Sequence, residues 1–245
     1  MIEHTRDAFY GGRLHVFQPS KGFRAGTDSL LLAAALPSEF KDEILELGCG
    51  AGGALLPAMH RVPHADFVGL ERDPDMAALA QAGLDASVFG ARGQIEIGDA
   101  ANLPPQWQNR FGLVFSNPPF FEAGSIQQPG TGKEAAYLES ISLKDWINAM
   151  LFALRPKGTL IMVHRAADLA RMLTVLERQT GEITVLPVHS YPGSDAKRVL
   201  VRARKGLRPG ALRLLSAKNL YEQKGGERTE WAKAMQQDGA GIDWN

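Results

Sequence analysis

The stretch ELGCGAGG, residues 46–53, decides the fold that this sequence predicts. It follows the apolar run DEILELG (42–48), which is typical of a buried strand, and it opens GALLPAMHRV (53–62), which has a helical pattern. Its repeated glycines let a backbone turn tightly and approach a ligand with no Cβ in the way. A strand, a glycine loop and a helix in this order favour a cofactor site in an α/β protein.

The same alternation continues on both sides of this stretch. Further strands are predicted over 65–71, 93–99, 111–117, 159–164, 183–190 and 197–206, and helices over 73–86, 142–158 and 165–181. Pro156 and Gly158 are expected to end the second of these helices, and Gly181 the third. Only YPGSDA joins the last two strands, which predicts a hairpin. We therefore expect a doubly wound, mostly parallel, seven-stranded sheet with one antiparallel strand.

Composition limits the domain organisation and the class of protein. The chain has 245 residues, 44% hydrophobic and 22% charged, with a formal net charge of zero. This predicts one domain over 1–245, in which we distinguish an N-terminal cap region (1–41), a core that holds the candidate site (42–205) and a basic extension (206–245). A neutral chain of this kind is not a basic clamp for nucleic acid as a whole, so an anionic partner must meet a local patch.

Several absences favour a cytoplasmic protein without a metal. Cys49 is the single cysteine of the sequence, which excludes an intramolecular disulfide and fits a reducing compartment. The first residues lack the layout of a signal peptide, and no run reaches the ~18 apolar residues of a membrane span. The six histidines show no metal-ligand spacing, so no metal site is expected.

Acidic residues follow the next two predicted strands. Glu71 ends one strand about 20 residues after the glycine loop, where a carboxylate can accept from both hydroxyls of a ribose. Asp99 ends the next strand, within reach of an adenine amine at the same sheet edge. Glu46 precedes the loop and would oppose a pyrophosphate but suits a cationic, amino-acid-bearing ligand. Together these residues point to S-adenosylmethionine (SAM), although each acid alone is better explained as a helix cap or a solvated strand end.

The sequence FSNPPFFEAG (115–124) has two interpretations. Asn-Pro is an ordinary way to end a strand, with the phenylalanines as core residues. Alternatively, the Asn117 side-chain oxygen and the Pro118 carbonyl present two acceptors at one point, with Phe120 as a stacking face. Two such acceptors would hold both N–H groups of a planar amine and direct its lone pair at a methyl donor. Phe121 is assigned to the core.

The sequence resembles the class I SAM-dependent methyltransferases over residues 42 to about 164. The motifs ELGCGAGG, GLERDP and IGDA carry this resemblance. The resemblance implies that Gly48, Gly50 and Gly52 contact the methionine and ribose part of SAM and that Glu71 binds the ribose hydroxyls. It also implies that the IGDA residues Asp99 and Ala100 lie near the adenine. NPPF resembles the signature of enzymes that methylate the exocyclic amine of adenine or cytosine, or a glutamine amide.

Two further stretches, one near each end of the sequence, indicate a particular family among these methyltransferases. QPSKGFRAGTDSLLLAAAL (18–36) reads as a turn followed by a helix capped by Thr27 or Asp28. With RVLVRARKG near the C-terminus, it resembles the bacterial tRNA(Val) adenine-N(6) methyltransferase family. That resemblance implies that Thr27 and Asp28 lie near the cofactor and that the substrate is tRNA.

Charge distribution agrees with a polyanionic partner. Between Asp195 and Arg228 the sequence holds ten basic and three acidic residues. Strand alternation puts Arg198, Arg202 and Arg204 on one face, with Lys205 beside them, as a candidate nucleic-acid contact. A solvated face is the alternative for many of these charges.

The alternatives at this stage include a glutamine-amide methyltransferase acting on a protein and a DNA adenine methyltransferase. A SAM-binding RNA-binding protein without turnover is the non-enzyme alternative. The sequence leaves open the tRNA species, the nucleotide, the oligomeric state and whether the loop 121–140 orders on substrate binding.

Overall fold

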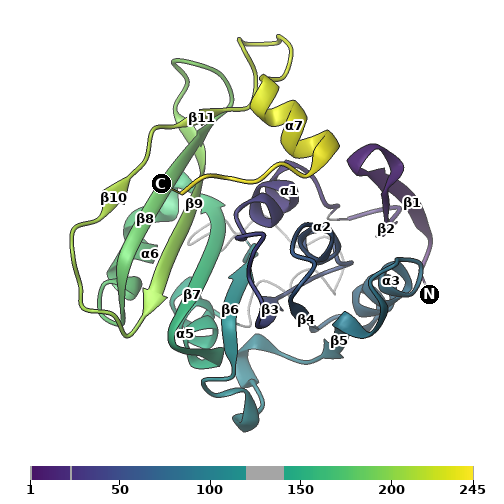
Figure 1. Cartoon of the computed structure of the whole chain (residues 1–245), viewed down its shortest axis with the longest axis horizontal. Coiled ribbons are helices and arrows are strands. Elements are labelled where there is room, and N and C mark those ends of the chain that lie inside the picture. The colour runs from purple at the N-terminus through teal and green to yellow at the C-terminus, as the bar shows by residue number, and fades with distance from the viewer. Residues whose placement is uncertain (1, 23, 120–140, 245) are drawn as a thin grey trace, which may run out of the picture.

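The computed structural model describes residues 2–22, 24–119 and 141–244 (Figure 1). Within these ranges, the centre is a sheet whose long strands lie in the order β8-β9-β7-β6-β3-β4-β5. They are β3 (Glu43–Leu47), β4 (Asp66–Glu71), β5 (Gly93–Ile97), β6 (Phe111–Ser116), β7 (Leu154–Arg165), β8 (Thr180–His189) and β9 (Ala196–Lys205). Among these seven strands, β9 runs antiparallel to the other six. The predicted sheet and its single antiparallel strand are confirmed.

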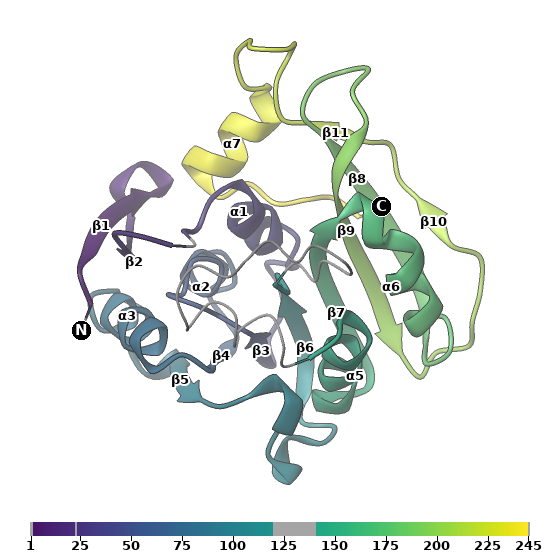
Figure 2. The same ribbon diagram turned by 180° about the vertical axis from the view of Figure 1, so that it is seen from behind.

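Helices cover both faces of the sheet. α1 (Thr27–Ala34), α2 (Leu55–Arg61) and α3 (Pro74–Asp85) lie on one face, and α5 (Leu143–Ala153) and α6 (Leu169–Leu176) lie on the other (Figures 1 and 2). Successive strand residues enter opposite cores: in β7, Ile161 joins the α1 side and Leu160 the α5 side. Burial on both faces explains why the strands read as continuous apolar runs.

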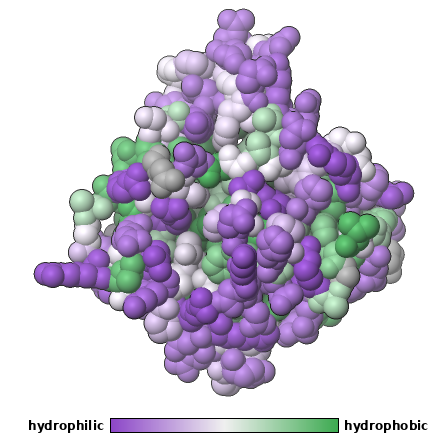
Figure 3. All heavy atoms as spheres, viewed as in Figure 1, coloured by the Kyte–Doolittle hydropathy of each residue, from purple (hydrophilic) through white to green (hydrophobic). Residues whose placement is uncertain are grey.

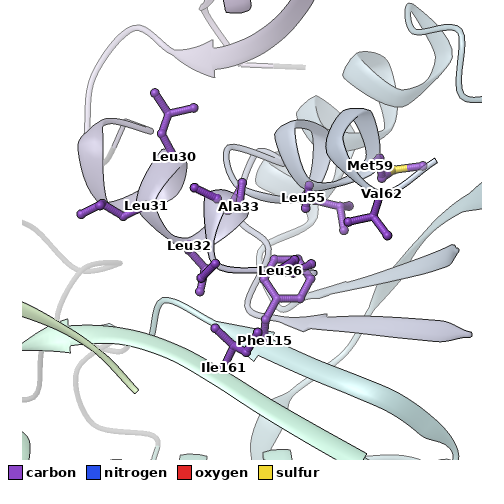
Figure 4. Packing of buried hydrophobic residues seen from close by; sticks show 14 of the residues in the cluster. Leu30, Leu31, Leu32, Ala33, Leu36, Leu55, Met59, Val62, Phe115 and Ile161 are labelled. Carbon is purple, nitrogen blue, oxygen red and sulfur yellow. The ribbon is translucent and has the colours of Figure 1, made fainter. Parts of the chain in front are cut away.

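The apolar core on the α1 side fixes α1 and α2 against the middle of the sheet. Leu32 and Leu36 from α1 and the turn after it point toward Phe115 and Ile161, and Leu55 comes from α2 (Figure 4). All five side chains are at most 1% exposed. The packing therefore fixes α1 and α2 on this face of the sheet.

Elements outside the expected set extend the fold at both ends of the chain. β1 (His4–Phe9) and β2 (Leu14–Pro19) form a separate antiparallel hairpin. β10 (Arg213–Leu214) and β11 (Lys218–Asn219) pair in parallel with β8, and α7 (Glu230–Asp238) follows them. The surface on the side shown in Figure 3 is mostly hydrophilic.

Two helices end earlier than the sequence predicted. α5 ends at Ala153, and both Pro156 and Gly158 lie within β7 instead of terminating a helix. Proline disfavours helical geometry at the residue before it, so the chain leaves the helix ahead of Pro156. α6 ends at Leu176, and Gly181 lies within β8. Strand pairing with β9 begins at Thr180 and overrides the helical pattern there.

The C-terminal residues are part of the core. The backbone N–H of Ile242 donates to the carbonyl of Ala34 at 2.8 Å, and Trp244 Nε1 donates to the carbonyl of Ala35 at 2.8 Å. Trp244 is 5% exposed, and the Arg202 guanidinium lies 4.9 Å from the centroid of its ring. The tail thus satisfies carbonyls at the end of α1 that the helix leaves unpaired.

We expect Trp244→Ala to lower the free energy of unfolding by about 3–5 kcal/mol, the usual range for emptying a buried tryptophan site. Urea denaturation followed by circular dichroism measures this change. Leu214→Ala is the control, because Leu214 is 65% exposed and its loss should cost less than about 0.5 kcal/mol. Equal stabilities of Trp244→Ala and the wild type would contradict the role assigned to the tail.

Candidate active site

The candidate site lies where β3 and β6 part at their carboxyl ends. β3 leads to β4 and β5 on one side, whereas β6 is followed by β7 on the other, so this is the topological switch point at which open α/β sheets bind ligands. A pocket opens at this edge. Its lining residues are Gly48, Leu70, Glu71, Arg72, Gly98, Asp99, Ala100, Pro119, Ile141 and Trp146.

The glycine loop takes the shape that its sequence predicted. Gly48, Gly50 and Gly52 have backbone φ values of 75°, 54° and 79°, which residues other than glycine rarely adopt. The N–H groups of Gly48 and Cys49 both donate to the carbonyl of Leu70 at 2.9 Å, which ties the loop to the end of β4. No atom lies within 4 Å of where a Cβ on Gly50 would stand, so this part of the loop faces open space.

Glu71 organises the loop as well as lining the pocket. Its two carboxylate oxygens accept from the backbone N–H groups of Gly50 and Asp73, each at 2.8 Å. The residue is 2% exposed. Each carboxylate oxygen has a second lone pair, so the same group can also accept a hydrogen bond from a ligand hydroxyl in the pocket.

Asp99 and Ala100 line the pocket next to Glu71, as the sequence predicted for the end of β5. One Asp99 oxygen accepts from the N–H of Ala101 at 2.9 Å, and the other lies 3.8 Å from Nη1 of Arg72. The hydrogen bond from Ala101 and the ion pair with Arg72 thus hold the Asp99 carboxylate in place. Its carboxylate stands at the same sheet edge as Glu71.

Glu46 is buried beneath the loop rather than lining the pocket. It is 2% exposed, and its Oε2 has no hydrogen-bond partner among the described residues. Burial, and next the nearby Glu71 carboxylate, raise the pKa of Glu46 well above 4.5, although a hydrogen bond from the N–H of Leu55 acts against this shift. Burial in the folded protein therefore favours the protonated form of Glu46.

This burial predicts a pH-dependent stability. The folded protein keeps a proton on Glu46 that the unfolded chain releases above a pH of about 4.5, so Glu46 lowers stability as pH rises above that value. Glu46→Gln removes the titration. We expect its gain in unfolding free energy over the wild type to grow by up to about 1.4 kcal/mol per pH unit between pH 5 and 7, measured by urea denaturation. Exposed Glu39→Gln is the control, and an E46Q difference that is constant with pH would contradict the assignment.

Asn117 follows β6 directly and points its amide into the interior. Its Oδ1 is buried and has no hydrogen-bond partner among the described residues. Pro118 is buried, and Pro119 lines the pocket. Buried amide oxygens are nearly always paired, so an orphaned one two residues before a pocket residue is a candidate acceptor for a hydrogen-bond donor from a ligand. Phe120 and Phe121 lie outside the described residues.

The block before α1 lies against the glycine loop but does not line the pocket. A Cβ on Gly53 would stand 2.3 Å from the Cβ of Ala25, so the two segments touch. The predicted cap is wrong: Gly26 is the N-cap of α1, and Thr27 and Asp28 are its first helical residues. The Asp28 carboxylate accepts instead from Nε of Arg198 at 2.7 Å.

A family model with the description methyltransferase small domain matches residues 21–189. The chain belongs to this family. A protein from Porphyromonas gingivalis named tRNA1(Val) (adenine(37)-N6)-methyltransferase is 30% identical over 205 residues, which cover 79% of each chain. One of the same name from Actinobacillus succinogenes is 29% identical over 86% of this methyltransferase and 88% of that protein. The resemblance inferred from the glycine loop, NPPF and the terminal blocks is confirmed.

Solved structures support the fold of this methyltransferase. The crystal structure of a predicted O-methyltransferase from Agrobacterium tumefaciens has a TM-score of 0.70 and 24% identity, and the match covers 88% of this chain and 98% of that one. A SAM-dependent O-methyltransferase from Thermotoga maritima has a TM-score of 0.55 and 16% identity over 78% of this chain and 69% of that one. Both show the Rossmann-like architecture that the strand order indicates.

The predicted basic residues of this methyltransferase are spread along β9, so that they lie toward opposite ends of the sheet's strands. Arg198 pairs with Arg165 at the carboxyl end of β7, which is the edge of the candidate site. Arg204 pairs with Thr159 near the other edge and donates to the carbonyl of Lys157. Lys205 Nζ donates to Asn109 Oδ1 and to two backbone carbonyls. Arg204 and Lys205 thus bind Asn109 and backbone carbonyls of α5 and β7, and neither lines the pocket.

Sequence reasoning missed several pocket residues of this methyltransferase. Trp146 lies on α5 and reads in the sequence as one more core position of an amphipathic helix. Arg72 directly follows Glu71, and its position next to a predicted ribose ligand was the available signal. Nothing in the sequence marked Ile141, which precedes α5. Trp146 and Ile141 reach the pocket through tertiary packing alone.

Within the described ranges, no cluster of three or more histidine, cysteine, aspartate or glutamate side chains is arranged to hold a metal ion. Over the same residues, no helix has the length and apolar character needed to cross a membrane.

Proposed function

We propose that this protein transfers a methyl group from SAM to the exocyclic N6 amine of an adenine in tRNA. The observation that carries the proposal is the Oδ1 of Asn117, which is buried without a hydrogen-bond partner among the described residues and lies two positions before the pocket residue Pro119. An amine donor from a substrate would satisfy this oxygen. The family, and the relatives that methylate adenine in tRNA, support this choice of substrate.

The described residues fit SAM. Glu71 would accept from the ribose hydroxyls, and Asp99 and Ala100 would border the adenine. Gly50 would leave room for the methionine part, and Gly48 would line the pocket next to it. The orphaned carboxyl oxygen of Glu46 beneath the loop suits a cation, since a nearby positive charge would draw the proton off this group. When bound, SAM supplies an electrophilic methyl group on a positively charged sulfur.

The residues after β6 would prepare the acceptor amine. Its nitrogen is a weak nucleophile because the lone pair is delocalised into the ring. Asn117 Oδ1 and the Pro118 carbonyl would accept its two N–H groups, which turns the lone pair toward the methyl group and stabilises the positive charge that develops on nitrogen. After transfer, the extra proton leaves the nitrogen for water. We assign Phe120 to stacking on the base.

We expect the tRNA substrate to contact the side of the molecule that holds the pocket. Arg198 is the best placed of the predicted basic residues, because it lies at the edge of the site and is held there by Asp28. On the similarity to the named relatives, we propose adenine 37 of tRNA1(Val) as the nucleotide. A tRNA substrate and the single cysteine favour the cytoplasm, and we propose a single catalytic domain over 1–245.

The test offers labelled SAM with total tRNA, duplex DNA and total protein in parallel, followed by mass spectrometry of the nucleosides or amino acids that carry label. We expect N6-methyladenosine in tRNA. Label only in protein would assign Asn117 to glutamine chemistry, and label only in DNA would assign the same pocket to an extruded base. Binding of SAM with no label in any pool would overturn the proposed reaction.

A further inference from the structure

Trp146 stands between the two halves of the candidate site. It is 8% exposed, comes from α5 and lines the pocket together with Gly48 of the glycine loop and Pro119 of the NPPF segment. A Cβ on Gly48 would lie 2.9 Å from ring atom Cζ2 and 3.0 Å from Cη2. The indole ring therefore packs directly on the first residue of the loop that would hold the cofactor.

The indole also joins a buried chain of hydrogen bonds. Trp146 Nε1 donates to Ser116 Oγ at 3.0 Å, and Ser116 Oγ donates to the carbonyl oxygen of Leu47 at 2.6 Å. Ser116 is the residue before Asn117, and the Leu47 carbonyl belongs to the peptide that leads into Gly48. The chain thus connects the last residues of the two strands that carry the two halves of the site.

This chain of hydrogen bonds lies just beyond the last backbone pairing between β3 and β6. The ladder between β3 and β6 ends at the pair Glu46 and Phe115. The next two residues, Leu47 and Ser116, are no longer a backbone pair of this ladder. The side chains of Ser116 and Trp146 take the place of the next backbone contact, so the gap between the glycine loop and Asn117 is set by side-chain hydrogen bonds.

We propose that Trp146 is a positioning residue that, through Ser116, sets the distance between the cofactor loop and the amine acceptors of Asn117 and Pro118. This role rests on the proposed function. Methyl transfer requires the two reacting atoms to be close and aligned, and a misplacement of about 1 Å can reduce a rate by about 100-fold. Cofactor affinity depends far less on this distance, because its contacts are made by the loop, Glu71 and Asp99.

The test compares Trp146→Phe, which keeps an aromatic ring against Gly48 but removes the N–H donor, with Ser116→Ala. We expect each variant to lower the single-turnover rate of methyl transfer about 10- to 100-fold. The dissociation constant of SAM, measured by calorimetry, should change less than about threefold. Because both changes break the same chain, the double variant should be no slower than the slower single variant.

Trp107→Phe is the matched control, since Trp107 is a 1% exposed tryptophan of the same apolar cluster that does not line the pocket. It should keep the wild-type rate. A full rate for Trp146→Phe, multiplied effects in the double variant, or a rate loss matched by an equal loss of SAM affinity would each overturn the positioning role. A wild type that binds SAM but methylates no adenine would overturn the proposed function first, and this role with it.

Discussion

Asn117→Ala should lower methyl transfer by about two orders of magnitude, the usual effect of removing one preorganised hydrogen-bonding group from an active site. The variant removes one of the two acceptors assigned to the amine. The Oδ1 has no hydrogen-bond partner among the described residues, so we expect the loss of this oxygen to cost little stability. SAM affinity should be nearly unchanged, because the cofactor contacts lie on the glycine loop, β4 and β5.

The measurement is the single-turnover rate on the labelled substrate pool, with SAM affinity and unfolding free energy determined in parallel. Asn148→Ala is the matched control, because it removes an amide of the same kind from α5, where Oδ1 of Asn148 accepts from Gln179. Asn148→Ala should keep the wild-type rate. Wild-type turnover in Asn117→Ala would contradict the acceptor role and leave the NPPF segment as a strand end only.

Gly48→Ala should weaken SAM binding at least tenfold, which corresponds to about 1.4 kcal/mol. Two effects act in the same direction. Alanine at a φ of 75° is strained by about 1–2 kcal/mol, and its Cβ would overlap the ring of Trp146. The loop or the ring must move, and both line the pocket, so its shape changes where the cofactor would lie.

Gly193→Ala separates these two effects. Gly193 has a φ of 80° and lies in the turn between β8 and β9, with no atom within 4 Å of the place that a Cβ would take. It should show the backbone strain as a loss of unfolding free energy of about 1–2 kcal/mol, with normal SAM affinity. Equal SAM affinities of Gly48→Ala and the wild type, measured by calorimetry, would contradict the placement of the cofactor against this loop.

Much of the fold and part of the site could be predicted because the signals are local. Glycine at 48, 50 and 52 is required by a backbone conformation that neighbouring residues alone impose. Glu71 and Asp99 were found by their places at strand ends, and parallel strands bring their carboxyl ends to one edge. Helix ends were harder, as α5 shows, because the strand that follows competes for the same residues.

The charged residues show where local reasoning stops. Arg198, Arg202 and Arg204 lie on one strand, β9, as the alternating sequence pattern predicted. The pattern could not predict the partners of these side chains. Arg198 meets Asp28, 170 residues away, and Lys205 meets Asn109, 96 residues away. A basic run therefore predicts charge, whereas the fold decides which of those charges are already used by the protein.

The sequence by itself determined the order of strands and helices, the glycine loop, the acids at the strand ends and the Asn-Pro-Pro segment. Each of these depends on hydrophobic periodicity or on the backbone limits of glycine and proline, which act over a few residues. Only the tertiary structure decided that Trp146, Ser116 and Leu47 would meet. Residues 30 and 69 positions apart come into contact there because the strand order places β6 beside β3, and that order results from the packing of the whole chain.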